Sequence, residues 1–150
     1  MGQGFRVALQ IVLGIVIVIL AYYLYVSITE PYKVIERQKE LTRLTRERMD
    51  DVRTALVLYE RDHDRYPLTL DSLVMYVKTD SLLRLRADSI FGGPVNPDSL
   101  PYSPRTGKPF EYAVNDTAKV KIYLLKDPDS NDQIGSLIPD VTLLNAASWE

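Results

Sequence analysis

The sequence contains no cysteine and only one histidine, and neither sign of charge dominates it. Without cysteine the chain has no disulfide bonds, no thiolate metal sites and no cysteine nucleophile. The formal net charge of −2 supplies no basic surface for a phosphate backbone, so we expect no nucleic-acid partner. The 150 residues show no internal repeat and no low-complexity tract. Their number suffices for one small domain besides an anchor.

Residues typical of catalysis are equally scarce. The one histidine, His63, lies between Asp62 and Asp64, and no serine nearby has the context of a nucleophile motif. Asp50 and Asp51 are adjacent, so on a helix their carboxylates point to different sides, and we expect a solvated face there. We therefore predict no catalytic residues, no enzymatic activity and no small-molecule substrate.

What the sequence has instead is a nearly unbroken apolar run at residues 7–28, after a short leader of residues 1–6. As a helix the run would reach about 33 Å, enough for a hydrocarbon core of about 30 Å. A cleaved secretory signal has a shorter apolar core and a small-residue cleavage site, which is missing here. Tyr22, Tyr23 and Tyr25 cluster at the far end, as at a membrane interface. We predict a permanent single-pass anchor that contacts membrane lipid and, through residues 7–28, other transmembrane subunits or further copies of the chain.

The charges around this run favour a cytoplasmic C-terminal side. Arg6 is the only basic side chain before the run, and six follow it before Met49: Lys33, Arg37, Lys39, Arg43, Arg46 and Arg48. The positive-inside rule counts lysine and arginine and gives little weight to the interleaved glutamates. These residues alone leave the orientation of the chain open.

Residues 29–64 have the composition of a helical neck that becomes the spine of a domain, with no glycine or proline from residue 32 to residue 62. Pro31 predicts a kink or break between anchor and neck. Packing of the neck on the chain's own domain is favoured over a coiled-coil dimer, because Thr45 and Arg48 interrupt the heptad. Apolar residues recur at spacings of three and four along one stripe: Leu41, Leu44, Val52, Leu56 and Tyr59, flanked by Met49 and Ala55.

Residues 65–150 are the predicted globular domain. Thr69 can cap a helix over residues 70–77, and Thr79 or Asp80 a shorter one that ends at Leu85. Residues 91–109 are rich in glycine and proline and predict an irregular connector. Two strands joined by residues 115–118 follow, and we expect the neck helix to cover their apolar faces. These faces are Phe110, Tyr112 and Val114, then Val120, Ile122 and Leu124.

An acidic segment, KDPDSNDQIGS, occupies residues 126–136. Asp127, Asp129 and Asn131 stand at positions i, i+2 and i+4, with Asp132 alongside, and oxygen ligands at such spacing can converge on Ca²⁺. An EF-hand loop is excluded, because its sixth position is Asp132 rather than glycine and its twelfth is not glutamate. A solvated turn is the alternative, since Asp, Asn, Ser and Pro all favour turns.

Short motifs recur in a characteristic order along nearly the whole chain. They are Ala55, Leu56, Tyr59, Asp62, Tyr66, Pro67, Leu70 and Leu73, then GKPFEY at residues 107–112, then Lys121, Ile122 and Tyr123 before Asp127, Asp129 and Gly135. In this order the chain resembles the type IV pilin-like proteins, most closely the major pseudopilins of type II secretion. The resemblance implies an α+β fold, in which an N-terminal transmembrane helix continues into a long amphipathic helix packed on a small antiparallel β-sheet.

The same resemblance implies a function and a location. The chain would be a non-catalytic structural subunit of a protein secretion or type IV pilus-like assembly. It would be anchored in the cell inner membrane, with its domain in the periplasm or outside the cell. The resemblance also implies a structural Ca²⁺ ion in the acidic segment, with Asp127, Asp129, Asn131 and Asp132 as candidate ligands.

The N-terminus departs from the family's pattern. Family precursors carry a short basic leader, then Gly and Phe, then a Glu four residues after the Phe. Here Gly4 and Phe5 are present, but the leader Met-Gly-Gln has no basic residue and Leu9 stands at the position of the Glu. This departure favours an alternative, in which the chain is an uncleaved single-pass accessory subunit of a larger membrane protein complex.

Overall fold

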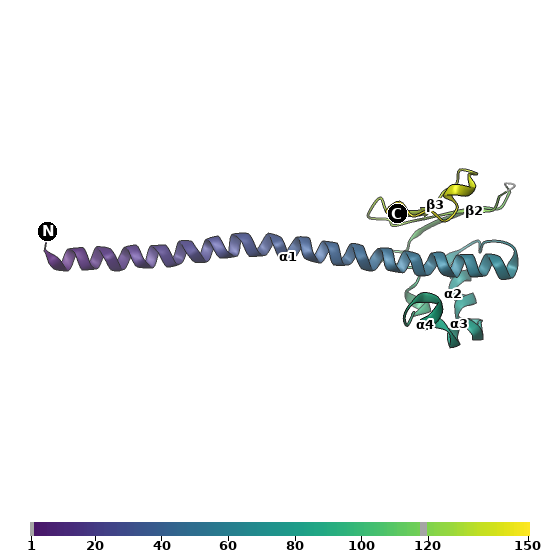
Figure 1. The fold of residues 1–150 in the computed structure, drawn as a ribbon, viewed down its shortest axis with the longest axis horizontal. Coiled ribbons are helices and arrows are strands. Elements are labelled where there is room, and N and C mark those ends of the chain that lie inside the picture. Colours follow the sequence, from purple (N-terminus) through teal and green to yellow (C-terminus); the bar gives the residue numbers. More distant parts are fainter. Residues whose placement is uncertain (1, 118–119) are drawn as a thin grey trace. The chain divides into compact units, whose positions relative to one another are not determined.

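Helix α1, Gln3–His63, is the longest element of the computed structural model, which describes residues 2–117 and 120–150 (Figure 1). Of the predicted kink or break at Pro31, the break is wrong, because α1 continues through that residue. A proline removes one backbone hydrogen bond from a helix, and the helix-forming residues on both sides outweigh that loss here.

Contacts within the chain divide it into two units, Met1–Glu40 and Leu41–Glu150. The large apolar side chains of the first unit are exposed, Val18 and Tyr25 among them. Within the described part of the chain, α1 is the one helix long and apolar enough to cross a membrane, and none of its most apolar stretch is buried. By length and composition this stretch suits a membrane anchor or an N-terminal signal sequence.

The second unit is mixed α+β, as the sequence predicts at this coarse level. The last turns of α1 run between a three-stranded sheet and a group of short helices (Figure 1). The short helices are α2 (Leu70–Thr79), α3 (Ser81–Leu85) and α4 (Ala87–Phe91), and single 3₁₀ turns lie at Pro97–Ser99 and Val141–Leu143. The strands are β1 (Glu111–Asn115), β2 (Ile122–Lys126) and β3 (Gln133–Gly135).

The sheet is antiparallel in the order β1-β2-β3. Tyr112 of β1 stands opposite Leu125 of β2, and Leu125 in turn stands opposite Ile134 of β3. The predicted hairpin of β1 and β2 is confirmed, although Ala118 and Lys119 of its connection lie outside the described residues. The sequence did not predict β3, which has only three residues and ends in glycine.

The prediction of which side chains of β2 face the core is wrong by one residue. Tyr123 and Leu125, rather than Ile122 and Leu124, belong to the main core cluster. Ile122 is fully buried as well, but outside that cluster. The simple alternation of apolar and polar residues counts Tyr123 as polar, whereas its ring is a large apolar surface that packs 4.8 Å from the ring of Tyr66.

The second half of α1 is the spine of the core. Met49, Val52, Ala55 and Leu56 are fully buried, and they pack with Leu73 of α2 and with the sheet. Burial of each of the larger side chains, Met49, Val52 and Leu56, contributes about 1.5–3 kcal/mol to folding. The prediction that the apolar stripe packs on the chain's own domain is therefore confirmed.

The stripe loses its apolar character toward its N-terminal end. Thr45 is fully buried, and its hydroxyl donates a hydrogen bond to the carbonyl of Leu41 at 2.7 Å. Leu44, at 36% exposure, lies at the edge of the core. The spine thus begins near residue 45, and its buried residues are already used within the domain rather than left for a coiled-coil partner.

Polar caps begin α2 and α3, as predicted. The Thr69 hydroxyl accepts a hydrogen bond from the backbone N–H of Ser72 at 3.3 Å. The Asp80 carboxylate accepts two, from the N–H groups of Leu82 at 2.7 Å and Leu83 at 3.1 Å. Each cap pairs backbone N–H groups that the helix itself leaves without an acceptor, and this contributes about 1 kcal/mol to stability. Helix α4 was not predicted.

The C-terminal segment is tied to the spine and the sheet. Arg53 of α1 donates hydrogen bonds to the carbonyl of Asn145 at 3.1 Å and to the carboxylate of Glu150 at 3.0 Å. The Tyr123 hydroxyl donates to the side chain of Asn145 at 2.8 Å. Trp149 packs partly buried against the core. Residues 145–150 therefore pack on the spine and the sheet.

Candidate functional site

The acidic segment forms the connection between β2 and β3. A backbone hydrogen bond from the N–H of Asp127 to the carbonyl of Asp132, 3.0 Å long, joins the ends of residues 127–132, which we call the acidic loop. The Asp127 residue is fully buried and Asp132 is only 9% exposed. The two aspartates at the base of the loop thus lie inside the domain, which does not fit a fully solvated turn.

Asp132 is held by an arginine of the spine. The Nη2 atom of Arg46 donates to Oδ1 of Asp132 at 2.9 Å, and its Nε donates to Oδ2 at 3.3 Å. The same guanidinium lies 5.2 Å from the centre of the Trp149 ring. Planar two-point pairing of this kind combines charge attraction with fixed orientation. Arg46 therefore fastens both the acidic loop and the C-terminal segment to α1.

Arg105, from the connector before β1, reaches both buried aspartates. Its Nε is 3.5 Å from Oδ2 of Asp127, and its Nη2 is 3.8 Å from Oδ2 of Asp132. Its Nη2 also donates a hydrogen bond to the hydroxyl of Thr42 at 3.1 Å. Both carboxylate oxygens of Asp127 and the Nε of Arg105 are buried without a hydrogen-bond partner.

Asp129 has other partners. Its carboxylate accepts hydrogen bonds from Nζ of Lys108 at 2.7 Å and from the hydroxyl of Thr106 at 2.6 Å. These two hydrogen bonds lower the pKa of Asp129 below its ordinary value. Asn131 is exposed. Of the four predicted calcium ligands, the structure therefore brings Asp127 and Asp132 together and pairs Asp129 with a lysine.

Within residues 2–117 and 120–150, no group of three or more His, Cys, Asp or Glu side chains is arranged to hold a metal ion. That finding does not test a site completed by amide or main-chain oxygens, which calcium also accepts. Calcium binding by Asp127, Asp129, Asn131 and Asp132 therefore stays a prediction.

Sequence reasoning missed the cations that face these carboxylates. Arg46 was noticed only as a charge in the neck, and Arg105 lies in a connector predicted to be irregular. Even the closest pair in sequence, Arg105 and Asp127, is separated by 22 positions. Neither the spacing of a helix nor that of a tight hairpin predicts such a pair. The one local signal is the pattern of turn-forming residues around Arg105, which fixes no partner.

A second acidic feature lies against the spine. Glu47, Asp50 and Asp51 line a cavity of about 410 Å³, together with the segment that contains Gly92 and Gly93. Asp50 and Asp51, where the sequence predicts a solvated face, are both partly exposed. The segment that follows α4 lines the same cavity as the two aspartates. The spacing of the two aspartates along α1 does not predict this neighbour.

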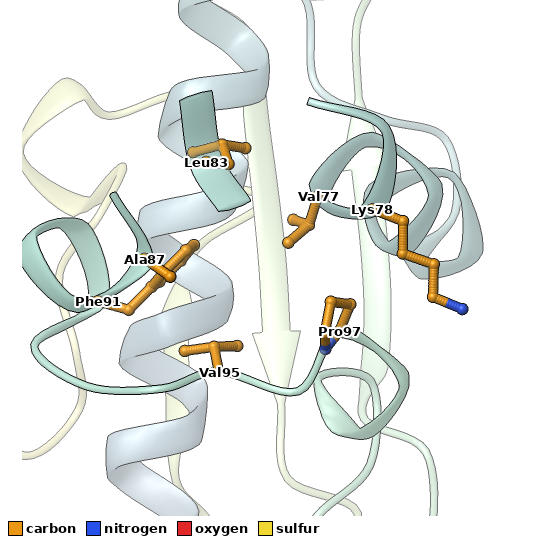
Figure 2. Close-up of a pocket in the computed structure, with 7 residues that line it drawn as sticks. All are labelled: Val77, Lys78, Leu83, Ala87, Phe91, Val95 and Pro97. Atoms are coloured by element: carbon orange, nitrogen blue, oxygen red, sulfur yellow. The ribbon is translucent and has the colours of Figure 1, made fainter. Parts of the chain in front are cut away.

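An apolar hollow of about 440 Å³ lies between the short helices and the segment that follows them. Figure 2 shows its apolar side chains converging on a common space while Lys78 points away. Lys78 pairs with Asp98. The described lining residues include no carboxylate, imidazole or hydroxyl to orient a substrate. They are Val77, Lys78, Leu83, Ala87, Phe91, Val95 and Pro97.

His63, the chain's one imidazole, is part of an aromatic stack. Its ring centre lies 4.2 Å from that of Tyr59, and 5.4 Å from that of Tyr76. Its Nδ1 is 3.1 Å from the carbonyl of Tyr59. Asp62 accepts a hydrogen bond from the Tyr76 hydroxyl at 2.6 Å instead of orienting the imidazole. That the chain is not an enzyme stays a prediction.

No family model, no curated protein sequence and no solved structure matches this chain. The likeness to the pseudopilins therefore depends on the order of motifs in the sequence.

Proposed function

We propose that this chain is a membrane-anchored, non-catalytic structural subunit with a pilin-like fold, working in a protein secretion or type IV pilus-like assembly. The observation that carries the proposal is that the two parts of α1 differ in burial. Its first part exposes an apolar surface, while residues 49–56 form the spine of an α+β domain with an antiparallel sheet. Such a helix suits a subunit that packs sideways in a membrane and presents its domain outside it.

The anchor offers a surface for lipid and for other spans. Gly14 lies in it with open space around its Cα, and small residues let helix backbones approach closely in membranes. Leu13 and Ile17 nearby are more than half exposed. We propose that residues 7–28 contact membrane lipid and either further copies of the chain or other transmembrane subunits.

We place the anchor in the inner membrane and the domain in the periplasm or outside the cell. The charge count opposes this orientation, but part of that count belongs to the folded domain. Arg43 pairs with Glu47, and Arg46 with Asp132. Translocated domains cross largely regardless of their charges, so these arginines weigh little. Labelling of a Ser89→Cys variant by a membrane-impermeant maleimide in spheroplasts tests this; labelling only after lysis would contradict it.

Photo-cross-linking tests the proposed assembly. A photoreactive benzophenone residue at Leu13, in the anchor, is expected to give adducts in native membranes with a second copy or with another membrane protein. The same residue at Ser89, an exposed position on α4, is the control for random collision. Recovery of the chain in the soluble fraction, or equal adducts from both positions, would contradict the proposal.

The alternative is an uncleaved accessory subunit of a larger membrane complex. It is favoured by the absence of a basic residue before Gly4 and by Leu9 in place of a glutamate. Mass spectrometry of the mature N-terminus separates the two. A chain that begins at a methylated Phe5 supports the filament subunit, and a start at Met1 or Gly2 supports the accessory subunit.

A further inference from the structure

The acidic loop is electrically balanced by the chain's own side chains. The three cations come from two other segments, α1 and the connector before β1, and each lies within 4 Å of a loop carboxylate. Three positive charges thus face three negative ones, and the cluster is neutral without an added ion. The cations are Arg46, Arg105 and Lys108, and the carboxylates are Asp127, Asp129 and Asp132.

Asp127 depends on Arg105 for its counter-charge. The Asp127 carboxylate is completely buried, and neither of its oxygens has a hydrogen-bond donor. The Nε of Arg105 is buried and also lacks an acceptor, and it lies 3.5 Å from Oδ2 of Asp127. A buried carboxylate without a counter-charge is strongly disfavoured, so this guanidinium is the group that makes Asp127 tolerable inside the domain.

Calcium, which the family resemblance implies, does not fit this arrangement. The ion takes six to eight oxygen ligands. Both oxygens of Asp132 are engaged by Arg46, and those of Asp129 by Lys108 and Thr106. A divalent ion bound to Asp127 would lie beside a guanidinium in a buried site, where like charges repel strongly.

We propose that Arg105 is the internal cation of the acidic loop and replaces a divalent metal there. One guanidinium joins three segments, because it contacts Thr42 of α1 and the two aspartates at the base of the loop. The turn between β2 and β3 is thereby fastened to the spine, and the domain folds independently of calcium.

The test is thermal unfolding of the full chain in detergent micelles, followed by the fluorescence of Trp149. This residue is the sole tryptophan, and it lies next to Arg46. The melting temperature of the unaltered chain is expected to be the same in 1 mM calcium chloride and in EDTA. Arg105→Gln is expected to lower it by at least about 5 °C, because it leaves a buried charge unpaired. Arg65→Gln, which removes an exposed arginine outside the cluster, is the matched control.

A double variant separates loss of charge pairing from loss of packing. Arg105→Gln combined with Asp127→Asn removes both charges and is expected to recover part of the melting temperature. A melting temperature of the unaltered chain that rises with calcium and falls with EDTA would overturn the proposal. An Arg105→Gln variant that melts like Arg65→Gln would overturn it as well. Should Arg105→Gln fail to fold, the double variant and the metal response of the unaltered chain decide the question.

Discussion

At the scale of single residues, the fold raises the pKa of carboxylates on the spine and lowers the pKa of one in the acidic loop. Asp51 lies half-buried, and burial raises its pKa to about 6, opposed by Arg48 and reinforced by Asp50 and Glu47. The pKa of Asp50 is raised for the same first cause. Compared with the unfolded chain, the folded state therefore favours the protonated form of Asp51. For Asp129 the opposite holds, because its partners lower its pKa. Asp51 costs stability at neutral pH.

Asp51→Asn is accordingly expected to stabilise the domain at pH 7.5 by about 1 kcal/mol, a value discounted because the group is half-exposed. The raised pKa means that the favourable contribution of the protonated carboxyl is complete below the unfolded pKa of about 4 and is lost as the pH rises through about 6. Urea unfolding of both proteins at pH 7.5 and at pH 4 measures the difference in the free energy of unfolding. A gain of equal size at pH 4 would show that burial of the charge is not its cause.

At the scale of elements, the sheet depends on its shortest strand. β3 pairs with β2, and its Ile134 bridges to Ala147 of the C-terminal segment. Gly135 ends this strand with φ +76°, and a Cβ there would stand 2.3 Å from the carbonyl oxygen of Tyr123. Only glycine combines that backbone angle with so close an approach of another strand.

Gly135→Ala is therefore expected to lower the free energy of unfolding by about 2–4 kcal/mol, through steric overlap with backbone and an unfavourable φ. Gly93→Ala is the matched control, because a Cβ at Gly93 meets nothing within 4 Å. We expect that control to change stability by less than about 1 kcal/mol. Urea unfolding followed by Trp149 fluorescence measures both, and equal losses in the two variants would contradict this role of Gly135.

At the scale of the whole molecule, the chain consists of two units that differ in how far their apolar side chains are buried. The core residues begin at Thr45, and every one of them lies within Leu41–Glu150. Among the described residues, those up to Glu40 contribute none of them. The second unit also has more than the roughly 60 residues with which many domains fold alone.

A fragment of residues 41–150 is thus expected to fold without the anchor and to stay in solution without detergent. Circular dichroism should show cooperative thermal unfolding, and hydrogen exchange should protect the α1 spine together with β1 and β2. A fragment that binds a hydrophobic dye and melts without cooperativity would show that the first unit, or the membrane, is needed for folding.

Local patterns account for the predictions that succeeded. The stripe that includes Val52 and Leu56, the caps at Thr69 and Asp80, and the alternation in β1 each depend on neighbours a few positions away. The failures at Pro31 and β2 have specific causes. One proline did not outweigh the helix on both sides, and Tyr123 is apolar over most of its surface although it ends in a hydroxyl. The pilin-like fold and the function stay predictions, and the predicted calcium ligands are untested and opposed by the proposal for Arg105.

The sequence by itself determined that this chain has an apolar helix, a helical spine, capped short helices and a strand pair, because these follow from spacings along the backbone. Only the tertiary structure decided which charges from distant segments meet. Arg105 and Asp127 are brought together by the path of the connector across the domain, and burial then makes their pairing matter. Contacts between distant segments depend on how the whole core closes, and no spacing along the chain encodes that.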